Sequence, residues 1–180
     1  IPKRSVSYAA SFGVNEIPDD KKADFSKAIG NLEAISVREE QGLNICRELG
    51  FKDGRVNIDP TFLLSKSEWI KVIRKPNKQL PSRYVVTYFL GNIEKNVDNK
   101  IENYCRANNL ERIDLNSVTA LKWFDITPFE FLYLIKNATF VFTDSFHASV
   151  FSIIFGKNFL TAERTTKNSN KMSSRIDTLF

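Results

Sequence analysis

The stretch 139-TFVFTDSFHASVFSIIFGKNFLT-161 contains His147, the one histidine of the chain, between a short β-branched and aromatic run and a long apolar run. Residues 139–143 predict a strand and residues 145–155 an apolar helix. Gly156 is expected to end this helix, because glycine suits a left-handed C-cap, and residues 158–161 predict another strand. This order of strand, helix and strand is typical of a parallel α/β sheet.

The same alternation continues on both sides of residues 74–83, a polar stretch with two prolines that favours a loop. The predicted fold class is therefore α/β, with two Rossmann-like units that contain parallel sheets. We expect residues 1–75 to form the C-terminal part of a first Rossmann-like domain, 76–82 a linker, and 83–180 a second Rossmann-like domain.

The individual elements follow from apolar periodicity and from helix end signals. Two helix starts carry capping boxes, Ser65 with Glu68 and Thr127 with Glu130. The remaining predicted strands cover 4–10, 33–37, 54–58, 83–90 and 110–115. The remaining predicted helices cover 19–32, 38–49, 93–108, 127–136 and 173–180, with one more after Ser65 and a loop over 163–172.

Composition narrows the class of protein. The chain is 42% hydrophobic and 26% charged, as in soluble globular proteins, and its net charge of +5 is scattered, which suits anionic small ligands better than nucleic acid. No secretory signal opens the chain and no apolar run reaches the ~18–20 residues of a membrane span, so we expect a cytoplasmic protein. Because the chain starts inside a strand pattern and ends inside a helix pattern, we expect a fragment or ordered portion of a longer protein, with its first unit incomplete.

Common cofactor and disulfide signals are missing from the sequence. Cys46 and Cys105 lie far apart and are expected to be reduced thiols. The sequence has no Cys/His cluster and no glycine-rich phosphate motif, so we expect no metal, no dinucleotide or ATP site, and no cofactor.

His147 is the strongest candidate for chemistry. Ligands of parallel α/β sheets bind at the carboxyl ends of the strands, which is where Asp144 and Ser145 follow the predicted strand and a helix begins. The free N–H groups of that helix start attract anions, and their positive potential should lower the pKa of His147. A neutral imidazole can exchange a proton with a bound substrate, while Asp144 could cap the helix or orient the ring. The alternative is a structural helix residue.

The run 139–160 resembles the C-terminal motif of the polysaccharide pyruvyl transferase family, an apolar strand, Thr-Asp, a variable residue, an apolar residue and His, then an apolar helix ending in Gly-Lys. Four further stretches resemble that family in the same order: SYAASFG (7–13), ISVREEQG (35–42), NIDPTFLLSKSEW (57–69) and SSRIDTLF (173–180). The family's early Asn/Gly-Asp-rich loop has no counterpart in this chain.

The resemblance implies a glycosyltransferase-B-like architecture, in which two Rossmann-like domains face a cleft. It also implies transfer of a pyruvyl group from phosphoenolpyruvate to a sugar of a cell-surface polysaccharide, such as a capsule or exopolysaccharide, or of its precursor, which gives a pyruvate ketal. Phosphoenolpyruvate and a saccharide acceptor would then be the partners, and the enzyme could associate with polysaccharide assembly machinery at the membrane surface.

The same resemblance implies that His147 is the catalytic acid or base. The expected substrate-binding residues are Ser11, Gly13, Arg38, Asp144, Ser145 and Arg175. Members of the family often carry Arg two positions before the histidine, where this chain has Ser145, so Arg38 or Arg175 is expected to supply the missing charge. Trp69 and Trp123 are expected to pack rather than to stack on sugars.

Two other functions remain open from the sequence. One is a sugar-nucleotide-dependent glycosyltransferase of the same fold, in which an acidic residue of the second domain would bind a ribose. The other is a non-catalytic carbohydrate-binding or assembly module, whose function would survive the substitution His147→Ala.

Overall fold

The computed structural model describes residues 4–116, 123, 125–164 and 174–179. The described residues form two compact units, one made of the residues up to Leu63 together with the C-terminal helix, the other of the residues from Leu64 to 164. The fold is α/β, and every strand pairing in both sheets is parallel, as the sequence predicted.

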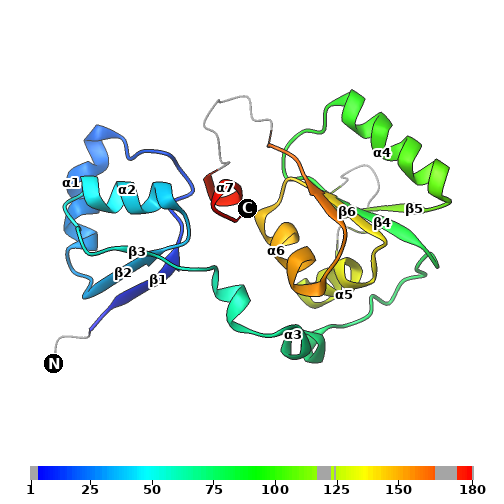
Figure 1. Cartoon of the computed structure of the whole chain (residues 1–180), viewed down its shortest axis with the longest axis horizontal. Coiled ribbons are helices and arrows are strands. Elements are labelled where there is room, and N and C mark those ends of the chain that lie inside the picture. The colour runs from blue at the N-terminus through cyan, green and yellow to red at the C-terminus, as the bar shows by residue number, and fades with distance from the viewer. Residues whose placement is uncertain (1–3, 117–122, 124, 165–173, 180) are drawn as a thin grey trace. The chain divides into compact units, whose positions relative to one another are not determined.

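The first unit contains a sheet in the order β1-β2-β3, with helices packed beside it (Figure 1). The buried side chains of Ile35, Val37, Leu43 and Cys46 form a core between the sheet and α2. The elements are β1 (Val6–Ala10), α1 (Asp19–Ile29), β2 (Ala34–Val37), α2 (Glu40–Glu48), β3 (Arg55–Val56), the 3₁₀ helix η1 (Pro60–Leu63) and α7 (Ser174–Leu179).

The second unit contains a sheet in the order β5-β4-β6-β7. Its elements are α3 (Lys66–Val72), β4 (Tyr84–Tyr88), α4 (Lys95–Asn108), β5 (Glu111–Asp114), α5 (Pro128–Asn137), β6 (Phe140–Thr143), α6 (Phe146–Phe155) and β7 (Phe159–Thr161). After β4 the chain adds β5 on one side and then returns to add β6 on the other. The strand order therefore reverses between β4 and β6, and such a switch point is where open α/β sheets bind ligands.

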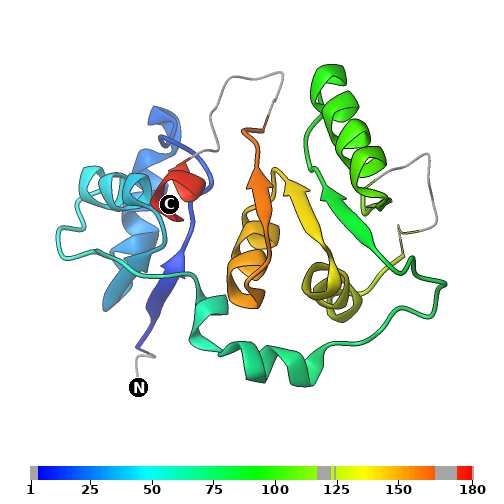
Figure 2. The same ribbon diagram turned by 45° about the vertical axis from the view of Figure 1, so that its right-hand side comes forward.

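Helices cover both faces of the second sheet (Figure 2). Val85 points toward α4 and packs with Ile101 and Cys105, whereas its neighbour Val86 packs on the opposite face with residues of α5 and α6. Successive residues of a strand point to opposite faces, so a strand buried on both sides reads as a continuous apolar run. That is why the sequence RYVVTYFL predicted β4 clearly.

The helix boundaries follow local signals in the sequence. Both predicted capping boxes are present, because Ser65 and Thr127 each accept a hydrogen bond from the backbone N–H of the glutamate three residues later. Gly156 has a φ of 65°, which is the left-handed conformation expected of a glycine that ends a helix.

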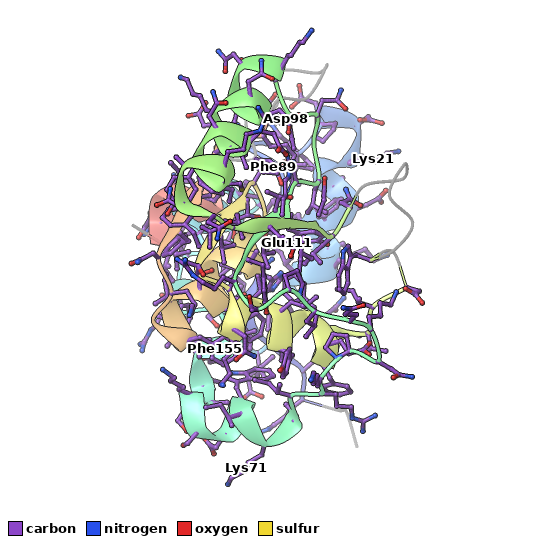
Figure 3. All side chains as sticks on the ribbon, turned by 90° about the vertical axis from the view of Figure 1, so that its right-hand side faces the viewer. Lys21, Lys71, Phe89, Asp98, Glu111 and Phe155 are labelled. Carbon is purple, nitrogen blue, oxygen red and sulfur yellow. The ribbon has the colours of Figure 1, made fainter. Side chains whose placement is uncertain are left out.

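The division into units differs from the predicted boundary at residues 76–82, which lie within the second unit. Helix α3 belongs to that unit because Trp69 packs edge-on against Phe151, with ring centroids 5.0 Å apart. The ammonium of Lys66 also donates to the backbone oxygen of Phe155 at 3.0 Å; Phe155 is labelled in the lower part of Figure 3. The prolines of the predicted linker mark a loop, and a loop by itself does not separate two cores.

The end of the chain also differs from the prediction, since α7 belongs to the first unit. There, Thr178 accepts a hydrogen bond from the backbone N–H of Glu40 at 3.4 Å, at the start of α2. The predicted loop over 163–172 lies outside the described residues from position 165 onward.

Several smaller features bear on the sequence predictions. Trp123 is buried in the core of the second unit, and Trp69 packs against that core, so both tryptophans pack as expected. Cys46 and Cys105 are free, buried thiols. Within the described parts of the chain, no helix has the length and apolar character required to cross a membrane.

Candidate functional site

Asp144 joins the carboxyl ends of β4 and β6 at the switch point. Its side chain is only 2% exposed. One carboxylate oxygen accepts from the backbone N–H of Leu90 at 2.7 Å, and the other accepts from Gly91 at 2.8 Å. Because charge-assisted bonds to backbone N–H groups are strong, Asp144 holds the loop after β4 against the end of β6.

Arg164 compensates the charge of this buried carboxylate. Its Nε donates to Oδ2 of Asp144 and its Nη2 to the backbone oxygen of the same residue, both at 3.3 Å. Arg164 fell in a predicted loop and was not among the predicted site residues. The only signal in the sequence was its position just after a predicted strand; the structure shows that this strand, β7, pairs with β6, which ends next to Asp144.

Ser145, and not Asp144, caps α6, which corrects one of the two roles suggested for Asp144. The hydroxyl of Ser145 accepts from the backbone N–H of Ala148 at 3.5 Å, and its own N–H donates to the hydroxyl of Thr143 at 2.9 Å. Asp144 lies one position before the N-cap, and both of its oxygens bind the loop after β4.

The helix behind His147 is buried almost throughout. Ala148, Ser149, Val150 and Ser152 have no exposed surface. The hydroxyl of Ser149 donates to the backbone oxygen of Ser145 at 3.1 Å, which adds a side-chain bond to the first turn. Since protein interiors are closely packed, this burial fixes the position of the turn that carries His147.

His147 itself is exposed and lies, with Ser145, on the wall of a pocket of about 360 Å³. The rings of His147 and Phe146 are nearly perpendicular, with centroids 5.3 Å apart. Other residues that line this pocket, called here the His147 pocket, include Tyr88, Leu90, Thr127 and Phe131. The walls are mostly apolar, with three hydroxyl groups and one imidazole, so a ligand in this pocket can reach the ring.

The first unit also contains a buried cluster of charged side chains, at the carboxyl end of β2. Arg38 Nη1 donates to Oδ2 of Asp59 at 2.6 Å, and these side chains are 16% and 2% exposed. Asp59 also accepts from the backbone N–H and the hydroxyl of Thr61, at 2.9 and 2.7 Å. Burial alone would raise the pKa of Asp59, but the bonds from Thr61 and Arg38 outweigh it and hold that pKa below its usual value.

Glu39 ties the predicted turn at Ser11 and Gly13 to this cluster. It is 1% exposed, and its Oε1 accepts from the backbone N–H of Phe12 at 3.1 Å. Its Oε2 lies 3.9 Å from Arg38 Nε and makes no hydrogen bond with any residue that the structure describes. Gly13, with a φ of 68°, donates to the hydroxyl of Ser11 at 3.1 Å.

The predicted site residues thus form two groups, one in each unit. Ser11, Gly13 and Arg38 lie together in the first unit, and Asp144, Ser145 and His147 lie together in the second. Arg175 is on α7 of the first unit. Among the described residues, no group of three or more His, Cys, Asp or Glu side chains could hold a metal ion.

A parallel sheet with a pocket and an accessible imidazole at its switch point is the arrangement in which α/β proteins place sites for small ligands, at the carboxyl edge of the sheet. The sequence model of the polysaccharide pyruvyl transferase family matches residues 1–163, so the chain belongs to this family of transferases of polysaccharide biosynthesis. No match was found among curated proteins or among solved structures.

Proposed function

We propose that the protein transfers a pyruvyl group from phosphoenolpyruvate to a sugar of a cell-surface polysaccharide or its precursor and leaves a pyruvate ketal. The observation that carries this proposal is the exposed His147, held on a buried helix at the switch point of the second sheet, in a chain of the pyruvyl transferase family. Phosphoenolpyruvate is a cytoplasmic metabolite, and the reaction is proposed to occur there.

The proposed reaction joins two hydroxyl groups of one sugar to C2 of phosphoenolpyruvate and releases inorganic phosphate. C3 gains a proton and becomes a methyl group, and the first hydroxyl adds to C2. The bond between C2 and the phosphate oxygen then breaks, and the second hydroxyl takes its place. One hydroxyl proton balances the proton gained by C3, and the other leaves with phosphate.

His147 is proposed to carry the proton that this reaction moves. An imidazole titrates near neutral pH, so it can deliver a proton to C3 or accept one from the attacking hydroxyl. The apolar walls of the His147 pocket, among them Tyr88 and Phe131, would keep water away from the cationic carbon that forms at C2.

The anionic groups of phosphoenolpyruvate need hydrogen-bond donors and positive charge. Ser145 offers a hydroxyl where related proteins carry arginine, and the first turn of α6 adds the positive end of the helix. We propose that the chain has a glycosyltransferase-B-like architecture and that Arg38 and the turn at Ser11 and Gly13 also take part in substrate binding. This last element rests on the family resemblance.

Ligand-dependent unfolding temperatures test this proposal. Phosphoenolpyruvate at about 100 times its Kd should stabilise the protein by about 2.7 kcal/mol, whereas uridine and guanosine diphosphate sugars should not. Release of inorganic phosphate from phosphoenolpyruvate in the presence of an acceptor saccharide gives a second readout. Stabilisation by a sugar nucleotide alone would favour a glycosyltransferase and exclude the proposed donor.

A further inference from the structure

A second, larger pocket of the second unit lies beyond the carboxyl ends of β4 and β5 and has a volume of about 770 Å³. Its lining includes Lys95, Asp98 and Glu102 of α4 and the pair Arg112 and Asp114 of β5. Asp98 and Phe89, both part of this lining, are labelled in Figure 3. This volume is within the range of ordinary small-molecule sites.

The guanidinium of Arg112 is the centre of this pocket, called here the Arg112 pocket. Its Nη1 donates to Asp98 at 2.6 Å and to Glu102 at 3.0 Å, and its Nη2 lies 3.5 Å from Asp114. Its Nε donates to the hydroxyl of Thr87 at 3.1 Å. These contacts therefore involve Nε, Nη1 and Nη2, the three nitrogens with which arginine would otherwise bind a phosphate or carboxylate.

The charge of the lining also disfavours an anionic ligand. Three carboxylates face two cations, Arg112 and Lys95. Burial would lower the pKa of Arg112, but the hydrogen bonds that it donates to Asp98 and Glu102 outweigh burial and raise that pKa, so the guanidinium stays charged and paired. The lining therefore carries an excess of negative charge, which repels the phosphate of phosphoenolpyruvate.

The carboxylates retain hydrogen-bonding capacity toward solvent. The side chains of Asp98, Glu102 and Asp114 are 44%, 41% and 29% exposed, and an ionised carboxylate offers about four acceptor sites. A divalent cation would compete with the guanidinium that already lies between them. Hydroxyl groups, which donate hydrogen bonds without bringing charge, are the better partners for these acceptors.

The remaining lining supplies an apolar surface beside these acceptors. Leu90 is 47% exposed and lies on the wall together with Ile93. A sugar ring presents hydroxyl groups at its rim and C–H groups on its faces, so it matches a lining of carboxylates beside aliphatic side chains.

The Arg112 pocket and the His147 pocket are neighbours. Leu90 lines both of them, and its backbone N–H is held by Asp144. The loop after β4 is thus a common wall, fixed by the buried carboxylate at the switch point. A ligand in the larger pocket would contact Leu90, which also lines the His147 pocket, without sharing the space that phosphoenolpyruvate is proposed to occupy.

We propose that the Arg112 pocket binds a saccharide, with Asp98, Glu102 and Asp114 accepting hydrogen bonds from its hydroxyl groups. That this saccharide is the acceptor of the pyruvyl group rests on the proposed function. The loop at Leu90 would then lie between the acceptor and the donor. The reacting hydroxyl groups of the sugar would extend past this loop toward His147.

Binding of uncharged sugars to the full chain, without phosphoenolpyruvate, tests this proposal. Saturation-transfer NMR and competition among the methyl glycosides of glucose, galactose, mannose, N-acetylglucosamine and N-acetylmannosamine would measure affinity. The substitutions Asp98→Asn and Glu102→Gln should each weaken binding of the preferred glycoside about tenfold, because each removes a charged acceptor. Glu111→Gln, an exposed carboxylate at the amino end of β5, is the matched control and should change nothing.

A steric variant separates binding from the ion pairs of Arg112. Asn92 is exposed on the lining and makes none of the bonds described above, so Asn92→Trp should block the pocket while the ion pairs stay intact. Loss of the glycoside signal in this variant, with an unchanged melting temperature, supports the proposal. Retention of the signal in Asn92→Trp and in both acidic variants overturns it.

The remaining outcomes distinguish this proposal from the proposed function. If phosphoenolpyruvate stabilises the protein but none of the glycosides binds, the saccharide pocket is wrong and pyruvyl transfer stands. If a glycoside binds and responds to the variants while phosphoenolpyruvate has no effect, the saccharide pocket is supported and the donor is wrong. If Asp98→Asn weakens only the binding of a nucleotide sugar, the pocket holds a ribose and the proposal is overturned.

Discussion

Each unit contains a buried carboxylate paired with an arginine near the carboxyl end of a strand, but the two clusters differ in how completely they are satisfied. In the second unit, Asp144 receives two backbone N–H bonds and contacts Arg164. In the first unit, Asp59 is equally well bonded, but the neighbouring Glu39 keeps one buried oxygen without a hydrogen bond. The first cluster therefore has unused hydrogen-bonding capacity, which buried groups rarely retain.

The two clusters therefore have different structural roles. The cluster at Asp144 fixes two strand ends and the loop between the two pockets, so it acts on backbone geometry. The cluster at Arg38 holds a side chain and the turn at Ser11 and Gly13, and two of its bonds, from Arg38 and Thr61 to Asp59, join side chains. We expect substitutions in the second unit to have the larger effects on folding, and the predictions below test this contrast.

The largest expected effect is on catalysis by His147, in the second unit. His147→Gln should reduce phosphoenolpyruvate-dependent phosphate release by about 10²- to 10⁴-fold, the usual worth of a general acid or base. The melting temperature should stay unchanged because the side chain is exposed. Ile153→Gln, an exposed position on the same helix, is the control, and wild-type rates in His147→Gln would remove the histidine from the mechanism.

The next largest effect is on stability. Asp144→Asn should destabilise the second unit by about 3–5 kcal/mol, because the amide cannot accept from both backbone N–H groups and leaves Arg164 without its carboxylate. Trp69 and Trp123 both belong to this unit, so urea unfolding followed by tryptophan fluorescence measures it. A change no greater than that of the surface variant Glu111→Gln would contradict the role given to Asp144.

An effect of intermediate size is expected on the pH dependence of the stability of the first unit. Because the pKa of Asp59 is lowered on folding, its contribution to stability is present above the ordinary aspartate pKa of about 3.9 and is lost as pH falls below that value through the folded pKa. Wild type should therefore lose more stability than Asp59→Asn between pH 7 and pH 3, as measured by urea unfolding followed by circular dichroism. Asp53→Asn, which removes an exposed charge, should follow the wild type, and parallel curves for Asp59→Asn would refute the prediction.

The smallest effect is expected at Glu39. The amide of Glu39→Gln can keep the bond from Phe12 and place its nitrogen where the carboxylate has no hydrogen bond, so the cost should be below about 1 kcal/mol. Urea unfolding compares it with Asp144→Asn, the same chemical change in the other unit. A loss as large as at Asp144 would show that the two clusters are equally constrained.

The local features of this protein were predictable from its sequence. Residues 139–161 predicted β6, α6, the glycine that ends α6 and β7, and the two capping boxes were identified by the spacing of a hydroxyl and a glutamate. The placement of His147 in the first turn of a buried helix follows from the same pattern. These features depend on side chains within a few positions of each other, so short-range physics is sufficient to specify them.

What only the tertiary structure decided involves residues far apart in the chain. The strand order β5-β4-β6-β7 sets the switch point, and it brings Leu90 and Gly91 to a carboxylate more than fifty positions away. The partnership of Arg164 with Asp144 and the membership of α7 in the first unit arise in the same way. Such contacts depend on how several elements pack together, and no periodicity within one element encodes which strand or charged side chain will be its neighbour.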